Sequence, residues 1–243
     1  MKACGITDKG IVRQINQDSF LFWVDSETDR AVAVLCDGMG GERAGEVAAQ
    51  LAAEAFLEHA RTSMDSGENM LSVDIARESA AWANLQVFDR ASRDTDCAGM
   101  GTTLVAVVIN GQDAAVVNVG DSRCYWLAES QILQVTRDHS WVQDLVDRGV
   151  ITSGEARSHP RKNLITRAVG HQRRIRSDIF RMDLREGDIL LLCSDGLSNL
   201  VTEAEIASEL ISGKDDESKC GALLRLALER GAPDNVTTVI LRR

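Results

Sequence analysis

The sequence predicts an α+β fold in which strands pack on strands and helices cover the outside. Two observations support this prediction. Apolar runs of strand length cluster in the middle of the chain, and the helical stretches form separate pairs instead of alternating with strands. A chain of 243 residues buries enough apolar surface to fold without a disulfide or a metal staple. Because repeats and Pro/Ser-rich linkers are absent from the sequence, we expect one domain over 1–243.

The strands are expected where short runs rich in apolar residues occur. In order, these runs are Ser19–Val24, Ala31–Cys36, Thr102–Ile109, Ala114–Val119, Arg123–Leu127, Leu133–Thr136, Ile179–Asp183, Ile189–Cys193 and Val236–Leu241. The longest uninterrupted apolar runs are six residues long, whereas a membrane-spanning helix needs about 18 or more. We therefore expect no membrane span.

The helices are expected as two pairs. The long pair covers Ala44–Arg61 and Met70–Ser92, and the first of these carries an apolar stripe at i, i+4 spacing. The short pair lies near Glu203–Ile211 and Ser218–Glu229. This grouping favours helices that lie outside the strands.

The segment Ser140–Asn163 differs from its surroundings and is expected to form a mobile flap. Its start predicts a short helix at Trp141, and Thr152 with Glu155 predicts a capping box for a second one. An exposed loop follows, in which basic side chains cluster near Pro160. These side chains either contact a substrate or form a solvated turn, and the sequence leaves both open.

Charge and cysteine content exclude several classes of function. The chain has 27 Lys+Arg and 37 Asp+Glu, a net charge of −10, so it repels nucleic acid and anionic lipid. Its basic clusters, such as Arg173–Arg174, are short. The six cysteines form no CxxC pair, and Cys36 and Cys193 end apolar runs as buried thiols do. The chain also starts without an apolar signal segment, so we expect a cytoplasmic location.

Aspartates recur at the ends of predicted strands. Asp37, Asp121 and Asp195 follow apolar runs, and Asp234 immediately precedes the last strand. Each alone is more often a turn residue than a ligand. Carboxylates gathered at one edge repel one another, and a hard cation between them removes that cost. Ligands that are all oxygen select Mg²⁺, Mn²⁺ or Ca²⁺ over zinc.

Two other features have competing interpretations. Gly38–Gly41 mimics a dinucleotide-binding loop, but Arg43 stands where the third glycine belongs. Arg13 lies shortly before Asp18, near the first predicted strand. It is either a surface ion pair or a fixed cation that grips a phosphate with two hydrogen bonds.

Motifs in order along the chain resemble those of the metal-dependent Ser/Thr protein phosphatases, the type 2C or PPM-type family. They are Gly5–Gly10 with Arg13 and Asn16–Asp18, Cys36–Gly41, Gly99–Thr103, Val119–Arg123, Thr136–Ser140, Leu164–Gly170, Cys193–Leu197 and Asp234–Thr237. The resemblance extends from Gly5 to Leu241. The compact chain and Met39 are similar to the bacterial branch, whose members usually oppose Hanks-type Ser/Thr kinases.

The resemblance implies a four-layer α/β-β/α sandwich of two antiparallel sheets flanked by helix pairs, with a metal centre at one end. It implies two tightly bound Mn²⁺ or Mg²⁺ ions and a third, weaker one. The implied roles are Asp37 as the bridging ligand, the Gly38 carbonyl on one ion, Asp195 and Asp234 on the first ion, Asp18 beside the second through water, Asp121 sharing the third with Asp195, and Arg13 on the phosphate.

The resemblance also implies an activity. A hydroxide that bridges the two ions attacks phosphoserine or phosphothreonine directly, so no phospho-enzyme forms. Eukaryotic relatives have a histidine where Met39 stands here, and we expect a metal-bound water to protonate the leaving alkoxide instead. The implied partners are phosphorylated proteins, a cognate kinase and its substrates in bacterial signalling.

Two alternatives stay open. A degenerate relative would bind phosphoproteins without turnover, although such a protein is expected to lose ligands and Asp37, Asp121, Asp195 and Asp234 are all present. A metal-dependent hydrolase of small phosphate esters is the other.

Overall fold

The computed structural model describes residues 1–66 and 70–243, and its strands form two antiparallel sheets. The six-stranded sheet contains β2 (Asp18–Asp25), β3 (Arg30–Met39), β4 (Gly101–Thr102), β5 (Leu104–Asn110), β6 (Asp113–Val119) and β9 (Asp178–Asp183). The five-stranded sheet contains β1 (Lys2–Asp8), β11 (Val236–Arg242), β10 (Ile189–Cys193), β7 (Arg123–Ala128) and β8 (Gln131–Gln134), in that spatial order.

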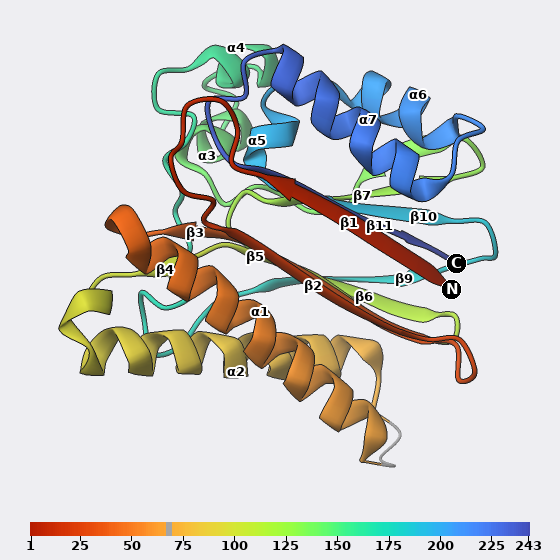
Figure 1. Cartoon of the computed structure of the whole chain (residues 1–243), viewed down its shortest axis with the longest axis horizontal. Coiled ribbons are helices and arrows are strands. Elements are labelled where there is room, and N and C mark those ends of the chain that lie inside the picture. Colours follow the sequence, from red (N-terminus) through yellow and green to blue (C-terminus); the bar gives the residue numbers. More distant parts are fainter. Residues whose placement is uncertain (67–69) are drawn as a thin grey trace.

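Helices cover the outer face of each sheet (Figure 1). The long helices α1 (Gly41–Asp65) and α2 (Ser72–Arg93) pack on the six-stranded sheet. The helices α6 (Glu203–Ile211) and α7 (Asp216–Glu229) pack on the other sheet. The four-layer α/β-β/α sandwich that the sequence predicts is therefore confirmed.

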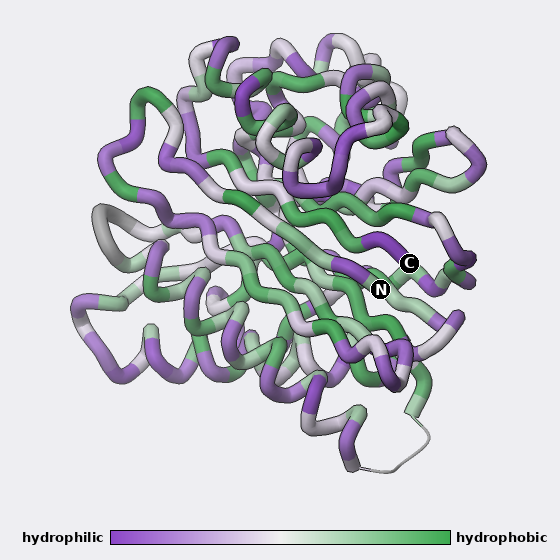
Figure 2. The backbone as a smooth tube through the Cα atoms, turned by 45° about the vertical axis from the view of Figure 1, so that its right-hand side comes forward, coloured by the Kyte–Doolittle hydropathy of each residue, from purple (hydrophilic) through white to green (hydrophobic). Residues whose placement is uncertain are grey.

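The central strands are buried on both faces because they lie in the middle of four layers. Along β3, Val32 and Val34 point toward α1 and α2. The alternating residues Ala33 and Leu35 point toward the opposite sheet. Figure 2 shows the result, with hydrophobic strands at the centre and mixed helices outside.

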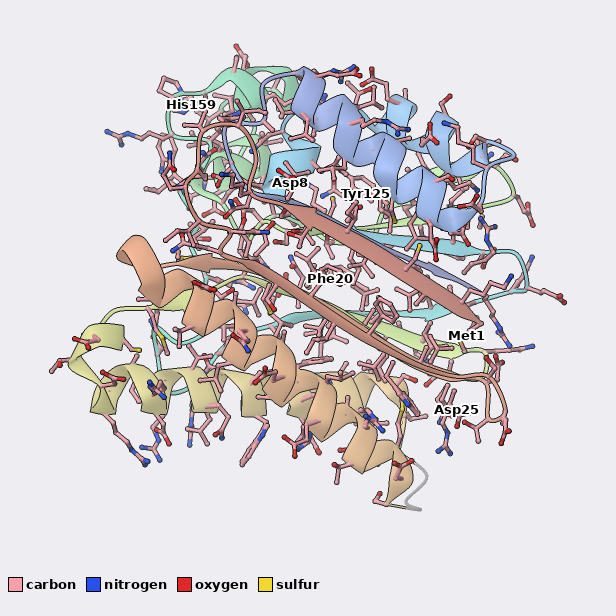
Figure 3. The ribbon with its side chains drawn as sticks, viewed as in Figure 1. Met1, Asp8, Phe20, Asp25, Tyr125 and His159 are labelled. Carbon is pink, nitrogen blue, oxygen red and sulfur yellow. The ribbon has the colours of Figure 1, made fainter. Side chains whose placement is uncertain are left out.

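The strand β1 is missing from the sequence-based prediction. Its interior position at Gly5 carries no side chain, and a Cβ there would lie 2.6 Å from the Phe20 ring. Figure 3 shows Phe20 in the space between the sheets. Phe20 belongs to β2 in the facing sheet and supplies the apolar contact, so β1 itself carries only the short apolar alternation of Cys4 and Ile6, which pack on the helix side.

Other predicted strands differ in their bounds. The run Ala31–Cys36 extends to Arg30–Met39 as β3, so Asp37 and Gly38 lie within the strand. The run Thr102–Ile109 divides into β4 and β5 at Thr103, whose hydroxyl and backbone N–H both bind the backbone of Asp37 at 2.9 Å. The run Leu133–Thr136 begins and ends two residues earlier, as β8.

The end of the sandwich opposite the chain termini positions the site (Figure 1). There β3 and β10 end and β11 begins, and there lies the flap, with helices α3 (Trp141–Asp147) and α4 (Ser153–Ser158). The predicted capping box of Thr152 and Glu155 is confirmed. Among the described residues, the helices are all too short or too polar to cross a membrane.

Candidate metal centre

Asp18 and Asp37 lie side by side on β2 and β3, two neighbouring strands of the six-stranded sheet. They are directly paired in the register of β2 and β3, which puts their Cβ atoms about 5 Å apart. Cys36 points toward the helices, so alternation turns Asp37 toward the second sheet. Two carboxylates therefore meet on one inner face, where like charges repel.

Asp18 reaches across to the second sheet. Its Oδ2 accepts hydrogen bonds from Ser194 Oγ at 2.8 Å and from Thr237 Oγ1 at 2.6 Å. Its Oδ1 is buried and has no hydrogen-bond partner within the described part of the chain. Burial raises the pKa of Asp18 to about 7, against the effect of the two hydroxyls. A buried carboxylate oxygen without a donor is suited to a cation or to a water held by one.

Asp195 and Asp234 come from the second sheet. Asp195 begins the short helix α5 (Asp195–Ser198) directly after β10, and Asp234 lies just before β11. Burial, followed by repulsion from Asp234, raises the pKa of Asp195 to about 6. The pKa of Asp37 is raised well above its ordinary value by burial and then by the charge of Asp18. The acids thus act on one another electrostatically across the two sheets.

Asn235 anchors the loop that carries Arg13. Its Nδ2 donates to the carbonyls of Lys9 and Ile15 at 3.0 Å each, and its Oδ1 accepts from Gln17 N–H at 2.8 Å. Sequence reasoning gave no role to Asn235, or to Ser194 and Thr237. The only signal available was that all three lie in the same short motifs as Asp195 and Asp234.

Arg13 forms an ion pair with Asp234 at 2.8 Å, and half of its side chain is exposed. It therefore satisfies the first of its two interpretations. The pair also places the guanidinium at the site. A cavity of about 380 Å³ is lined by Arg13, Lys162, Asp195 and Asp234, so two cations and two predicted ligands share one space.

Gly38 lies where β3 packs against the start of α1. A Cβ at this position would lie 2.0 Å from the carbonyl oxygen of Gly45, so no side chain fits. Its N–H donates to the carbonyl of Gln17 at 3.0 Å. The chain at Asp37 and Gly38 is therefore held by both neighbouring segments.

Asp121 lies beside Asp195, on a turn that His139 fixes. The Gly120 N–H donates to His139 Nδ1 at 3.1 Å, so the ring proton is on Nε2, which donates to Asp178 Oδ2 at 3.0 Å. Burial lowers the pKa of His139, which keeps the ring neutral. Both ring nitrogens are engaged, so His139 is not a free proton donor. Burial, and then the charge of Asp195, raises the pKa of Asp121.

The flap contributes to the same region. Arg157 and Lys162 line a cavity of about 170 Å³ together with Asp121 and Asp195. His159 and Arg161 instead pack on the Trp141 ring, at 5.2 and 5.6 Å from its centroid. Figure 3 shows His159 on the outer side of the flap. The basic cluster predicted near Pro160 is thus divided between the site and the Trp141 ring of the flap.

The donor set fits hard divalent cations. It consists of carboxylates that burial and mutual repulsion make costly to ionise, together with the unpartnered Oδ1 of Asp18. In residues 1–66 and 70–243, however, no three acidic, imidazole or thiol groups converge as a preformed cage. The structure thus brings the predicted residues to one end of the sandwich without fixing a coordination geometry.

Comparisons with known proteins point the same way. The family model described as protein phosphatase 2C matches residues 11–221. The serine/threonine phosphatase stp of Listeria welshimeri is 34% identical over 244 residues, which cover 98% of this chain and 94% of that protein.

Solved structures share the fold. The serine/threonine phosphatase PstP/Ppp of Mycobacterium tuberculosis has a TM-score of 0.86 at 36% identity, covering 98% of this chain and 97% of that one. A catalytic domain of PstP described in complex with two manganese ions has a TM-score of 0.81 at 35% identity, with 98% and 96% covered.

Proposed function

Because the chain belongs to the protein phosphatase 2C family and is a Ser/Thr-specific phosphoprotein phosphatase, we propose that it acts in one step, by attack of hydroxide that bound divalent ions generate from water. The observation that carries this proposal is the buried cluster of mutually repelling carboxylates, with one oxygen of Asp18 unpartnered.

The proposed ligands are those that the resemblance implies. Two Mn²⁺ or Mg²⁺ ions would be held tightly and a third one weakly. The residues that would hold them are Asp37 between the two tight ions, the Gly38 carbonyl, Asp195, Asp234, Asp18 through water, and Asp121 with Asp195 at the third. The PstP structure described with two manganese ions supports the tight pair.

A phosphocysteine intermediate is disfavoured by the state of the nearby thiols. Cys36 and Cys193 adjoin the acidic cluster, and both are fully buried. Burial raises the pKa of the Cys193 thiol to about 12 and raises that of Cys36 as well. Neither forms a thiolate near neutral pH, so the chain offers no thiol nucleophile beside the acids.

Arg13 is the proposed phosphate-binding residue. Its guanidinium already contacts Asp234, and it borders the cavity that Lys162 also lines. A guanidinium offers paired donors that match two phosphoryl oxygens. The side chain would exchange its carboxylate partner for the phosphoryl group.

The proposed cellular role rests on the resemblance to the bacterial branch of the family. We propose that the protein is a single domain over 1–243, that it works in the cytoplasm in bacterial signalling, and that it opposes a cognate Hanks-type Ser/Thr kinase by acting on that kinase and its substrates.

Chelation tests the metal dependence. Metal-stripped protein in excess EDTA is expected to lose turnover of a phosphothreonine peptide, and added Mn²⁺ or Mg²⁺ is expected to restore it. Full activity in EDTA would overturn the proposal. A hydrolase of small esters would instead turn over a nitrophenyl phosphate far better than the peptide.

A further inference from the structure

The loop that joins the flap to β9 carries a group of unpaired cations. Arg173, Arg174 and Arg176 are exposed, and none makes an ion pair or a side-chain hydrogen bond within the part of the chain that the structure describes. In a chain with a net charge of −10, such a group gives a local positive charge. We call Arg167, His171, Arg174 and Arg176, which line a hollow of about 230 Å³, the basic hollow.

The loop is held rigidly by one buried polar side chain. Asn84 on α2 is 1% exposed. Its Oδ1 accepts from Gly170 N–H at 2.9 Å, and its Nδ2 donates to the carbonyls of Gln172 at 2.9 Å and Arg173 at 3.2 Å. Gly170 has φ +92°, and a Cβ there would lie 2.4 Å from Val87. The arginines are therefore presented on a fixed backbone, which lowers the entropy cost of binding.

The basic hollow adjoins the metal centre. Thr102 pairs with Gly38 on one side and exchanges backbone hydrogen bonds of 3.1 and 2.8 Å with Val169 on the other. Because neighbouring strands lie about 4.8 Å apart, Val169 is about 10 Å from Gly38. On the other flank, Arg167 Nη1 lies 3.0 Å from His139, which holds the turn before Asp121.

The free charge of the basic hollow comes from two of its arginines. Arg167 is paired with Asp178 at 2.7 Å, so its charge is offset. Arg174 and Arg176 remain to attract an anion. Their planar guanidinium groups match carboxylates.

We propose that the basic hollow binds acidic side chains of the phosphoprotein substrate. An extended peptide advances about 3.3 Å per residue, so about 10 to 15 Å corresponds to about three to five residues from the phosphorylated one. The enzyme as a whole has a net charge of −10, so the unpaired arginines supply a local attraction for such a sequence. The inference rests on the proposed function, since the phosphoryl group must be held at the metal centre.

The test compares matched phosphothreonine peptides with Glu, Gln or Lys at positions three to five on either side, together with nitrophenyl phosphate. The variant is R174E/R176E, and the control R185E/R225E makes the same charge change at two exposed arginines outside the basic hollow. We expect kcat/KM of the variant to fall about tenfold on the Glu peptide and to rise on the Lys peptide. The Gln peptide and the aryl phosphate should change little, as should the control on every substrate.

Equal changes on the Glu and Gln peptides, or the same change in the control, would overturn the inference. A loss of aryl phosphate turnover in R174E/R176E would indicate damage to the metal centre or the fold. In that case the salt dependence of the unmodified enzyme tests the inference instead. Its kcat/KM must fall more steeply with salt on the Glu peptide than on the Gln peptide. Equal salt dependence would refute the binding of acidic side chains in the basic hollow. The peptide comparison is made with metal present, whereas the chelation experiment tests the proposed function. The two results can therefore be told apart.

Discussion

At the scale of one residue, Asp121 allows the proposed weak third metal site to be tested separately from the two tight sites. Its turn is fixed by His139, and among the acids Asp195 raises its pKa most. A position with two protein carboxylates keeps several waters and binds an ion weakly. We expect the change Asp121→Ala to leave the fold and the tight ions in place.

The same change should reduce turnover of a phosphopeptide more than turnover of an aryl phosphate. Met39 cannot protonate the leaving alkoxide, and both ring nitrogens of His139 are engaged. We therefore propose that a water on a third ion held by Asp121 and Asp195 would supply the proton. An aryl leaving group needs that proton less. The ratio of the two rates at saturating Mn²⁺ measures the effect, and equal losses would contradict the separate role of Asp121.

His139 predicts a pH dependence of stability. Burial lowers the pKa of the folded imidazole, whereas the unfolded chain takes up the proton near about 6.5. At His139 the unfolded state therefore binds more protons as the pH falls below about 6.5, so the contribution of this residue to the free energy of unfolding decreases there. The raised pKa values of Asp18 and Asp195 act in the opposite direction over the same range. We expect the change His139→Gln to lower the slope of the unfolding free energy against pH between pH 7 and 5, because it removes a positive contribution to that slope. Urea unfolding at several pH values measures it, with the exposed His171→Gln as control, and an unchanged slope would refute the assignment.

At the scale of elements, the flap divides its basic residues between two tasks. Arg157 and Lys162 border the acids, whereas Arg161 stacks on Trp141. We expect alanine at Arg157, Arg161 and Lys162 to lower kcat/KM on protein substrates far more than on a small aryl phosphate. The change Arg161→Ala alone should act mainly through loosened flap packing, with a smaller effect. If both substrate types lose activity equally, the flap takes no part in recognition.

The elements also show why part of the structure was accessible from the sequence. Strands such as β10 and helices such as α6 carry their own apolar pattern, and the prediction for Glu203–Ile211 matches the helix bounds. β1 carries only the short alternation of Cys4 and Ile6, and at Gly5 the space is filled by Phe20 of the facing sheet. The hydroxyls of Ser194 and Thr237 bind Asp18 from positions 176 and 219 residues away, a contact that only the tertiary fold creates.

At the scale of the whole molecule, the acidic cluster lies at the seam between the two sheets. Asp18 and Asp37 belong to one sheet, and Asp195 and Asp234 adjoin strands of the other. Strand-end aspartates were recognisable from the sequence, because each follows or precedes an apolar run. Their meeting at one end depends on how the sheets face each other, which no local pattern specifies.

Calorimetric titration of Mn²⁺ into metal-free protein and its Asp37→Asn variant, with phosphopeptide turnover measured on the same samples, tests the central claim most directly. Asp25→Asn, at the far end of β2 (Figure 3), is the matched control. The account predicts two tight ions and turnover in the unmodified protein and in the control. It predicts loss of both in Asp37→Asn, with an unchanged circular dichroism spectrum. Near-normal turnover in Asp37→Asn, or intact tight binding of both ions, would contradict the account.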